Sequence, residues 1–240
     1  MRIVVTAGPT REYLDPVRFL SNPSTGKMGF AIAAEAARRG HEVTLIAGPV
    51  ALKTPKGVER VDVVSARDML AAVKKSLLTS CCGFGSLEHR RVGASDHLLN
   101  FTVFISTAAV ADWRPAKCAA KKLKKGEMSG VLKLVRNPDI LKTIDSYRKR
   151  SKAVGLRLVG FAAETDHVLG EAARKCREKG LSFIVANDVT KKGCGFGTDT
   201  NKVTFVFPDG AQRKFPLMTK RMVAKRILDA VSSVAAGREE

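Results

Sequence analysis

Four segments of the sequence combine residue types suited to binding phosphate groups, and the first lies near the N-terminus. Residues 24–29 read Ser-Thr-Gly-Lys-Met-Gly at the expected start of a helix. Backbone N–H groups at a helix start, with Lys27 beside them, can form a phosphate cradle. Alternatively, Gly26 and Gly29 only let the helix pack closely on a sheet while Ser24 caps it. The sequence alone leaves both interpretations open.

The second segment follows an expected strand and ends in a run of lysines. Residues 106–115 are mostly small and include Asp112, which could bind a ribose or a metal ion, and residues 121–125 read Lys-Lys-Leu-Lys-Lys. Small residues let a flat or phosphorylated ligand approach the backbone, and four lysines can neutralise a triphosphate and its leaving group. Most lysine runs are solvated surface loops, but the position of this one after the end of a strand favours a nucleotide site.

The third and fourth segments carry weaker signals. The third is Asn-Pro-Asp-Ile at 137–140, and the fourth is Gly-Phe-Ala-Ala-Glu-Thr at 160–165. Lys175 and Lys179 follow on one face of an expected helix. Lys175 could equally form an ordinary ion pair with Glu171, four residues earlier. Taken alone, each of these segments favours a structural interpretation.

An alternation of strands and helices is expected to position the four segments. β-Branched runs bounded by Gly or Pro indicate strands, and apolar residues at helical spacing after capping residues indicate helices. Ser65 to Asp68 form a capping box, and Pro208-Asp209-Gly210 predicts the turn of a β-hairpin. We expect strands at 2–7, 42–47, 61–64, 101–106, 131–135, 156–162, 182–186, 203–207 and 212–215, and helices at 26–39, 66–77, 138–150, 166–179 and after Thr219.

These elements predict an α/β fold of the doubly wound type. Its Rossmann-like sheet is expected to be mostly parallel, with the last two strands as a β-hairpin extension. In such sheets ligands bind beyond the carboxyl ends of the strands, where the four segments fall. Asn187 also follows a strand and could simply terminate it. The Gly-x-Gly-x-x-Gly turn of dinucleotide-binding enzymes is absent after the first strand, which disfavours a nicotinamide-dependent oxidoreductase.

Length and composition predict a single globular domain over residues 1–240. The chain is 45% hydrophobic and 27% charged, which excludes collagen-like and wholly disordered classes, and no apolar run approaches the length of a membrane span. Five cysteines without a Cys-x-x-Cys pair indicate free thiols in the cytoplasm. Residues 79–98 lose periodicity and predict a flexible insertion, in which Cys81 and Cys82 are read as part of a loop rather than as a redox or metal site.

The net charge of +19, from 42 Lys and Arg against 23 Asp and Glu, calls for anionic partners. Nucleic acid, an anionic membrane surface and a phosphorylated small molecule would each satisfy it. A nucleic-acid-binding protein is disfavoured because the basic residues are scattered and no aromatic stacking motif accompanies them. We therefore expect neither a membrane nor a specific nucleic acid as partner.

Seven motifs occur in a characteristic order along the chain. They are Ala-Gly-Pro-Thr-Arg-Glu with Asp-Pro-Val-Arg, Ser-Asn-x-Ser-x-Gly-Lys-Met-Gly, Ala-Ala-Val-Ala-Asp-Trp-Arg-Pro, Lys-Leu-Lys-Lys, Asn-Pro-Asp-Ile, Gly-Phe-Ala-Ala-Glu-Thr and Ala-Asn-Asp-Val. The series resembles phosphopantothenoylcysteine synthetase in its bacterial, CTP-using form, from Arg2 to about Phe207.

The resemblance implies a ligase of coenzyme A biosynthesis. In this family the carboxylate of 4′-phosphopantothenate attacks the α-phosphate of CTP, giving an acyl-cytidylate and pyrophosphate, and the amine of L-cysteine then displaces CMP. The resemblance also implies Mg²⁺, carried mainly by the nucleotide phosphates with no protein ligands assigned, and a cytoplasmic homodimer that associates through the late β-hairpin. Many bacterial members are fused to a flavin-dependent decarboxylase. Because this chain begins at the synthetase's first strand, we expect no FMN and a decarboxylase only as a separate partner.

The family's functional residues can be carried over by motif. Lys122 matches the flap lysine that assists acyl-cytidylate formation, Asn22 matches the asparagine that acts on this intermediate in the second step, and Arg18 matches a nearby active-site arginine. The expected nucleotide contacts are Ala108, Ala109, Asp112, Lys122, Pro138, Asp139, Ile140, Phe161, Lys175 and Lys179. The expected substrate contacts are Gly8, Asn22, Ser24, Gly26, Gly29 and Asn187.

Overall fold

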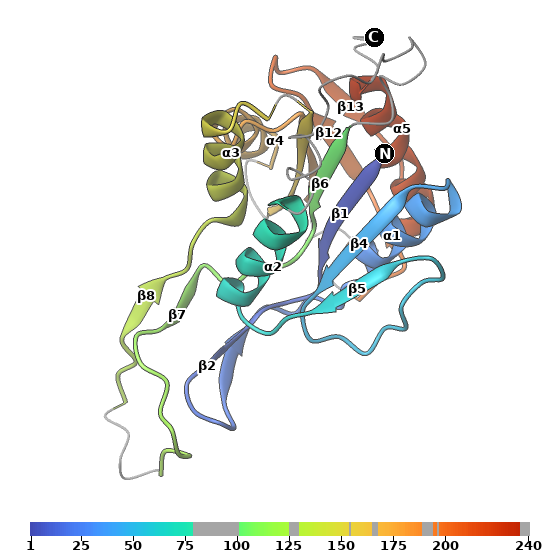
Figure 1. The fold of residues 1–240 in the computed structure, drawn as a ribbon. Coiled ribbons are helices and arrows are strands. Elements are labelled where there is room, and N and C mark those ends of the chain that lie inside the picture. The colour runs from blue at the N-terminus through green and yellow to red at the C-terminus, as the bar shows by residue number, and fades with distance from the viewer. Residues whose placement is uncertain are drawn as a thin grey trace, which may run out of the picture.

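The computed structural model describes residues 1–78, 101–124, 130–153, 155–164, 168–188, 194–195 and 197–235. Its centre is an eight-stranded sheet in the order β13-β12-β10-β9-β6-β1-β4-β5 (Figure 1). The parallel strands are β1 (Arg2–Ala7), β4 (Glu42–Ala47), β5 (Glu59–Asp62), β6 (Thr102–Ser106), β9 (Leu156–Glu164) and β10 (Phe183–Asp188). The antiparallel strands β12 (Val203–Val206) and β13 (Gln212–Lys214) extend one edge.

The order of the strands confirms the predicted doubly wound fold. From β1 the chain adds β4 and β5 on one side, then crosses to β6, β9 and β10 on the other, so the winding reverses between β1 and β6. The late hairpin is also confirmed, with β12 and β13 joined by the predicted turn. Reversal points of this kind are where doubly wound sheets bind ligands.

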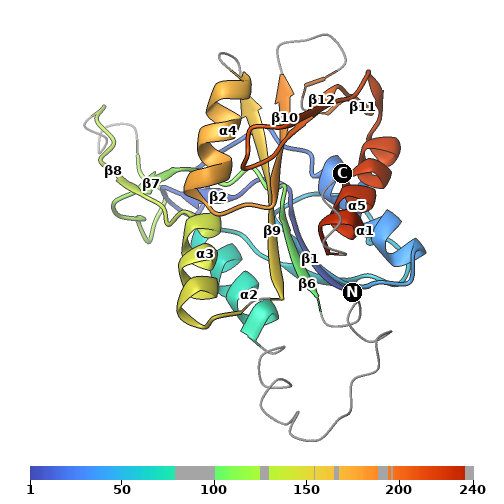
Figure 2. The same cartoon turned by 90° about the horizontal axis from the view of Figure 1, so that it is seen from above.

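Helices cover both faces of the sheet (Figure 2). Helices α1 (Lys27–Arg38) and α5 (Lys220–Ala235) lie on one face, and α2 (Ala66–Leu78), α3 (Ile140–Arg150) and α4 (Val168–Glu178) lie on the other. A hydrophobic core lies on each face of the sheet. Side chains alternate along a strand, so Val5 of β1 packs in the core under α1 and α5 and Val4 packs in the core on the opposite face. None of the described helices is both long and apolar enough to cross a membrane.

Two predicted helix caps are confirmed, and one predicted helix start is two residues early. Ser65 and Asp68 form the capping box of α2, with Ser65 Oγ donating to Asp68 Oδ2 at 2.8 Å. Thr219 Oγ1 accepts from Met222 N at 3.3 Å at the start of α5. The helix expected from residue 138 starts instead at Ile140, because Asp139 caps it by accepting from Lys142 N at 3.0 Å. The caps at Ser65 and Thr219 are contacts local in sequence, and local patterns therefore predicted them.

Two of the expected strands are wrong in position or partner. The strand expected at 61–64 lies two residues earlier, as β5, where its residues pair with β4. The strand expected at 131–135 does not join the main sheet, because β6 already pairs with β1 and β9 on its two edges. Instead β8 (Leu134–Arg136) pairs only with β7 (Trp113–Pro115), and Val131 is 83% exposed.

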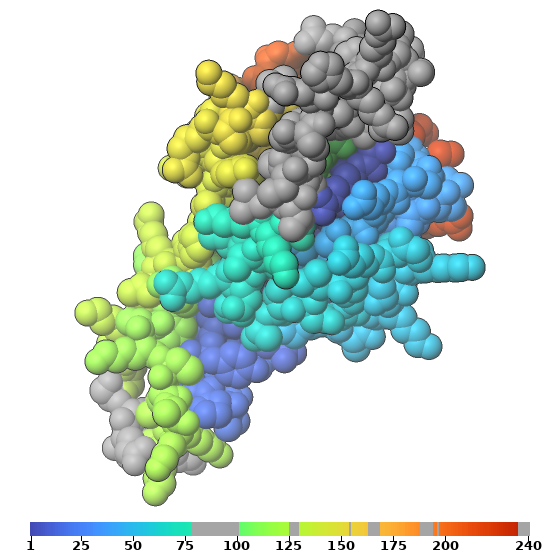
Figure 3. All heavy atoms as spheres, in the orientation of Figure 1, coloured from blue at the N-terminus to red at the C-terminus, as the bar shows by residue number. Residues whose placement is uncertain are grey.

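Three small two-stranded sheets were not predicted as pairs, and among their strands only β8 overlaps an expected one. They are β2 (Arg11–Tyr13) with β3 (Phe19–Ser21), β7 with β8, and β11 (Thr200–Asn201) with β14 (Met218–Thr219). We call β7, β8 and the described residues between them, 116–124 and 130–133, the arm. The arm and the β2–β3 hairpin extend together from the carboxyl edge of the sheet, and the arm stands out from the body of the molecule (Figures 1 and 3).

The cysteine predictions can be checked only in part. Cys118, Cys176 and Cys194 are free thiols, and burial raises the pKa of Cys176 to about 11. Cys81 and Cys82, with the predicted insertion at 79–98, lie outside the described residues.

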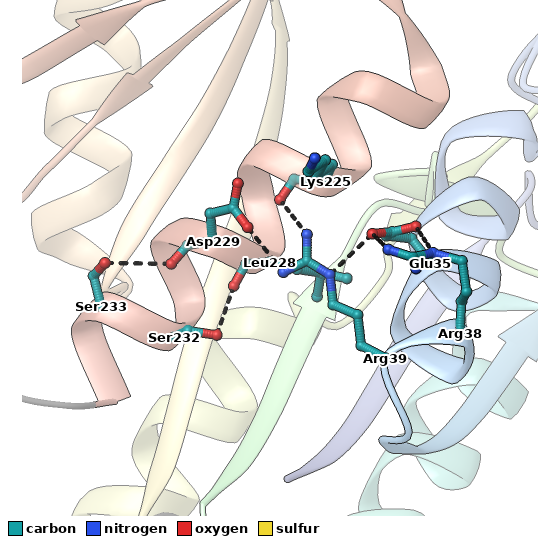
Figure 4. Close-up of polar contacts among 8 residues, drawn as sticks. All are labelled: Glu35, Arg38, Arg39, Lys225, Leu228, Asp229, Ser232 and Ser233. Carbon is teal, nitrogen blue, oxygen red and sulfur yellow. Dashed lines mark hydrogen bonds and ion pairs between the residues drawn. The ribbon is translucent and has the colours of Figure 1, made fainter.

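Buried Glu35 binds two arginines, and one of them, Arg39, links α1 to α5 (Figure 4). Its carboxylate accepts from Arg38 Nη2 at 2.7 Å and from Arg39 Nε at 2.9 Å. Arg39 continues to α5, where it pairs with Asp229 at 2.9 Å and donates to Lys225 O at 3.1 Å. The Arg38 hydrogen bonds and those of Arg39 outweigh burial and lower the pKa of Glu35 to about 2.

Replacing Glu35 by glutamine is expected to lower the free energy of unfolding by about 2 kcal/mol at pH 7, because two guanidinium groups lose a charged acceptor. The folded-state pKa lies below the ordinary value of 4.5, so this contribution is fully present above pH 4.5 and fades as the pH falls toward 2. Urea unfolding should therefore show a smaller difference between the proteins at pH 3. An equal difference at both pH values would contradict the role of the ionised carboxylate. Glu42→Gln is the control, since Glu42 also pairs with an arginine, Arg2, but its side chain is 72% exposed.

Candidate functional site

The loops that follow β1 and β6 run side by side beyond the sheet. Ala109 N donates to Gly8 O at 2.9 Å, and Thr10 N donates to Ala109 O at 3.3 Å. Thr107 Oγ1 also donates to Thr6 O at 2.6 Å. The small residues of the second predicted segment are thus fixed at the point where the winding reverses.

Helix α1 starts against these loops, and two glycines allow the close approach. Its N-cap is Gly26 in the left-handed region, with φ 77°, and a Cβ there would lie 3.3 Å from Gly8 N. A Cβ on Gly29 would lie 2.5 Å from Ala7 Cβ, too close for any other residue. Ser24 is not the N-cap, since its hydroxyl only accepts from Gly26 N at 3.4 Å. The packing interpretation therefore holds for Gly29, and it leaves the first turn of the helix available to a phosphate.

A cavity of about 420 Å³ lies between the start of α1, the loop after β6 and the ends of β9 and β10. This volume is within the range of small-molecule sites. The cavity brings together predicted residues from all parts of the chain: Asn22, Ser24, Gly26, Gly29, Ala108, Ala109, Asp112, Phe161, Lys175 and Asn187.

Two asparagines of the cavity wall are oriented by backbone carbonyl groups. Asn22 Nδ2 donates to Ala109 O at 3.2 Å, and Asn187 Nδ2 donates to Cys194 O at 2.9 Å. The Oδ1 atom of Asn187 is buried and has no hydrogen-bond partner within the described part of the chain. A buried acceptor without a partner costs free energy, which a donor on a bound ligand would recover. Asn187 therefore has a feature that termination of a strand does not require.

Two further lysines line the cavity, and only one of them has a signal in the sequence. Lys27, noted beside the expected phosphate cradle, donates to Gly197 O at 2.8 Å and pairs with Asp199 at 2.7 Å. Lys220 opens α5 and donates to Thr198 O. Burial and the charge of Lys27 lower the pKa of Lys220, and Asp199 partly opposes this. No local pattern marks Lys220, because only the tertiary fold brings α5 to the cavity.

The charges of the cavity lining favour an anionic ligand. Among the described residues that line it, Lys27, Lys175 and Lys220 face one carboxylate, that of Asp112. Glu171, considered as a structural partner of Lys175, pairs with Arg174 at 2.7 Å, and its ion pair with Lys175 stays a prediction. Within the described residues no group of three or more His, Cys, Asp or Glu side chains could hold a metal ion.

Several predicted residues lie beside the cavity rather than in its wall. The backbone of Gly8 packs against Gly26, the N-cap of α1. Pro138, Asp139 and Ile140 lie at the start of α3, which Asn137 ties to the cavity rim by donating from its backbone N to Asp112 O at 2.8 Å. Asp139 pairs with Lys179 Nζ at 2.9 Å. Burial raises the pKa of Asp139, but the hydrogen bonds from Lys142 N and Lys179 outweigh it, so the pKa is lowered overall.

Lys122 and Arg18 also lie outside the cavity wall. Lys122 is exposed on the arm. Arg18 lies in the turn of the β2–β3 hairpin, where its Nη2 atom donates to Leu123 O at 2.7 Å and pairs with Asp15 at 2.6 Å. The structure therefore joins Arg18 to the residue that follows Lys122, and neither of the two predicted residues lines the cavity.

Comparison with known proteins identifies the family. A family model described as the DNA/pantothenate metabolism flavoprotein C-terminal domain matches residues 1–81 and 90–234. The chain belongs to this family. The residues between the two matched ranges fall inside the segment that we predict to be an insertion.

Curated relatives and a solved structure agree with this assignment. The chain is 42% identical over 234 residues to the coenzyme A biosynthesis bifunctional protein CoaBC of Escherichia coli K12 and 43% identical to that of Bacillus subtilis 168. These alignments cover 96% and 97% of the chain but 51% of each relative, so the chain spans about half their length. The crystal structure of the CoaBC C-terminal domain superposes with a TM-score of 0.74 at 40% identity, covering 98% of this chain and 96% of that one. The predicted family resemblance is thereby confirmed.

Proposed function

We propose that this chain joins 4′-phosphopantothenate to L-cysteine in coenzyme A biosynthesis, using CTP to activate the carboxylate. The observation that carries the proposal is the lysine-lined cavity at the winding reversal, whose described lining residues all lie within the ranges that the family model matches. An anion-binding cavity at this position suits a phosphorylated substrate and a nucleotide together. The names of the relatives, which place them in coenzyme A biosynthesis, support the same pathway.

The first step activates a poor acyl donor. The carboxylate of 4′-phosphopantothenate attacks the α-phosphate of CTP, and pyrophosphate leaves with the electrons of the broken phosphoanhydride bond. The first turn of α1 and Lys27 are suited to the substrate phosphate, and Lys175 and Phe161 to the nucleotide. Lys122 stabilises the charge that develops as pyrophosphate departs.

Magnesium, when bound, would neutralise charge on the nucleotide phosphates. Asp112 is the carboxylate of the described cavity wall, and the described residues offer no cluster of ligands around it. This donor set suits an ion carried by the nucleotide phosphates, with at most one protein ligand. FMN has no role in the proposed reaction.

The second step forms the amide. The amine of L-cysteine attacks the acyl carbon of the acyl-cytidylate, the bond to the phosphate oxygen breaks and CMP leaves. Asn22 is held by Ala109 O beside the small residues of the second segment. Its amide is suited to stabilising the oxygen that gains negative charge during this attack.

We further propose that the protein works as a cytoplasmic homodimer. Lys122 lies outside the cavity wall, so the arm must approach a cavity for the first step. Trp113, Val131 and Leu134 on the arm are 45%, 83% and 39% exposed, and Val17 on the adjacent hairpin is 57% exposed. Apolar surface of this extent supports burial against another protein surface. Association through the β12–β13 hairpin, and a separate decarboxylase as a partner, stay predictions.

The deciding experiment follows pyrophosphate release with 4′-phosphopantothenate, L-cysteine and each nucleoside triphosphate in turn. We expect release with CTP and formation of one amide product per pyrophosphate. Absence of CTP-dependent release with both substrates present would refute the proposal. A titration of nucleic-acid binding against salt tests the rival class, since tight binding with a steep salt dependence would favour a nucleic-acid-binding protein.

A further inference from the structure

Asp15 is a fully buried carboxylate at the carboxyl edge of the sheet, and the proposed mechanism leaves it without a role. It lies in the turn between β2 and β3. Its Oδ1 atom accepts from Val17 N at 2.9 Å and from Arg18 N at 2.8 Å, which closes the turn. These two bonds are the local part of its environment, and an asparagine could make both.

The Oδ2 atom of Asp15 makes a different set of contacts. It accepts from Arg18 Nε at 3.0 Å, from Arg18 Nη2 at 2.6 Å and from Leu123 N at 3.3 Å. Arg18 Nη2 also donates to Leu123 O at 2.7 Å. Both backbone groups of Leu123 are therefore held by one carboxylate and guanidinium pair from a distant part of the chain.

The same turn forms a hydrogen bond to the arm at a second point. Ala119 N donates to Leu14 O at 2.8 Å, one residue before Asp15. The turn thus fixes the arm on both sides of residues 120–122. A chain segment anchored at both ends has few backbone conformations, so the exposed Lys122 between the anchors is confined in position.

We propose that Asp15 is a positioning residue, which acts with Arg18 to hold the backbone of Leu123 and thereby the place of Lys122. The proposal rests on the proposed function of Lys122 in the nucleotide step. It also gives Arg18 a task that its location explains, since this side chain lies outside the cavity wall. We call the Asp15, Arg18 and Leu123 contacts the clamp.

Electrostatics supports an ionised Asp15 at neutral pH. Burial alone raises the pKa of this carboxyl, but hydrogen bonds from Val17 N, from Arg18 and from Leu123 N outweigh it and hold the pKa well below its ordinary value. The clamp is therefore charge-assisted, and such bonds are stronger than those between neutral groups.

The variant Asp15→Asn separates the clamp from the turn. Its Oδ1 atom can keep the bonds to Val17 N and Arg18 N, whereas the amide nitrogen cannot accept from Leu123 N or Arg18. Amide hydrogen exchange at Leu123 is expected to become about 10-fold faster or more, corresponding to the loss of one hydrogen bond. Asp145→Asn is the matched control, because buried Asp145 pairs with Arg148 at the same sequence spacing on α3. Unchanged exchange at Leu123 in Asp15→Asn would overturn the clamp, and this measurement needs no enzyme activity.

Kinetics tests whether the clamp acts through Lys122. Asp15→Asn is expected to slow CTP-dependent pyrophosphate release about 100-fold, as expected for a misplaced catalytic group, with the KM for cysteine unchanged. In the double variant with Lys122→Ala, the rate should equal that of Lys122→Ala alone. If the rate losses of the two single variants instead multiply in the double variant, Asp15 acts independently of Lys122 and the positioning role is overturned.

If wild type releases no pyrophosphate, the proposed function fails while the exchange result still stands. If Asp15→Asn does not fold, Arg18→Lys replaces it, since a lysine cannot hold Asp15 and Leu123 O in the same bidentate way.

Discussion

Replacing Lys122 by alanine is expected to slow CTP-dependent pyrophosphate release about 1,000-fold, the size of effect seen when one preorganised stabilising group is removed from a reacting centre. The lysine is exposed on the arm, so the free energy of unfolding should stay within about 0.5 kcal/mol of wild type. Initial rates at saturating CTP, 4′-phosphopantothenate and cysteine measure the effect, and urea unfolding measures the stability.

The matched control for this prediction is Lys117→Ala. Lys117 is also an exposed lysine of the arm, but it precedes the part held by the clamp. Its removal lowers the positive charge of the arm by the same amount, so general attraction of the nucleotide changes equally in both variants. Equal losses in the two variants would show that the arm contributes only bulk charge, and would contradict a specific role for Lys122.

Replacing Asn22 by aspartate is expected to separate the two chemical steps. Pyrophosphate should still form, in a burst of about one equivalent per site, because the lysines that serve the first step are unchanged. Amide formation should fall about 100-fold or more, because a carboxylate cannot donate to the developing oxyanion or to Ala109 O. Rapid-quench measurements of pyrophosphate and of the acyl-cytidylate, the latter by mass spectrometry, would follow both steps.

Asn137→Asp is the control for the assignment of Asn22 to the second step. Asn137 Nδ2 donates to Ala111 O at 2.8 Å, so this variant loses a similar amide-to-carbonyl bond outside the cavity wall. We expect its ratio of amide to pyrophosphate to remain near one, whatever its overall rate. An equal loss of pyrophosphate and amide in Asn22→Asp would contradict the assignment of Asn22 to the second step.

Local sequence patterns predicted those parts of the fold that depend on near neighbours. The capping box at Ser65 and the cap at Thr219 are set by contacts three residues apart. The strands at 2–7 and 42–47 were predicted with the observed bounds, because buried parallel strands are continuous apolar runs. The strand at 131–135 failed because an apolar run does not specify which partner it will find.

The residues of the candidate site also fall into two groups, those that local patterns predicted and those that only the structure reveals. Residues such as Ala108 and Gly26 were found because they directly follow a strand or begin a helix, where a ligand can approach the backbone. Lys220 was missed, since nothing in its neighbours distinguishes it from other surface lysines. Its burial, and its approach to Thr198, exist only when α5 packs beside α1.

Short runs of neighbouring residues were enough to predict the alternation of strands and helices, the family and about half of the described residues that line the cavity. Which of those residues meet depends on the tertiary structure. It brought Asn22, Lys175 and Lys220 to one cavity. It also joined Asp15 and Arg18 to Leu123, more than one hundred positions away. Contacts of this kind depend on how the strands are ordered in the sheet, and that order results from packing between distant segments rather than from any local pattern.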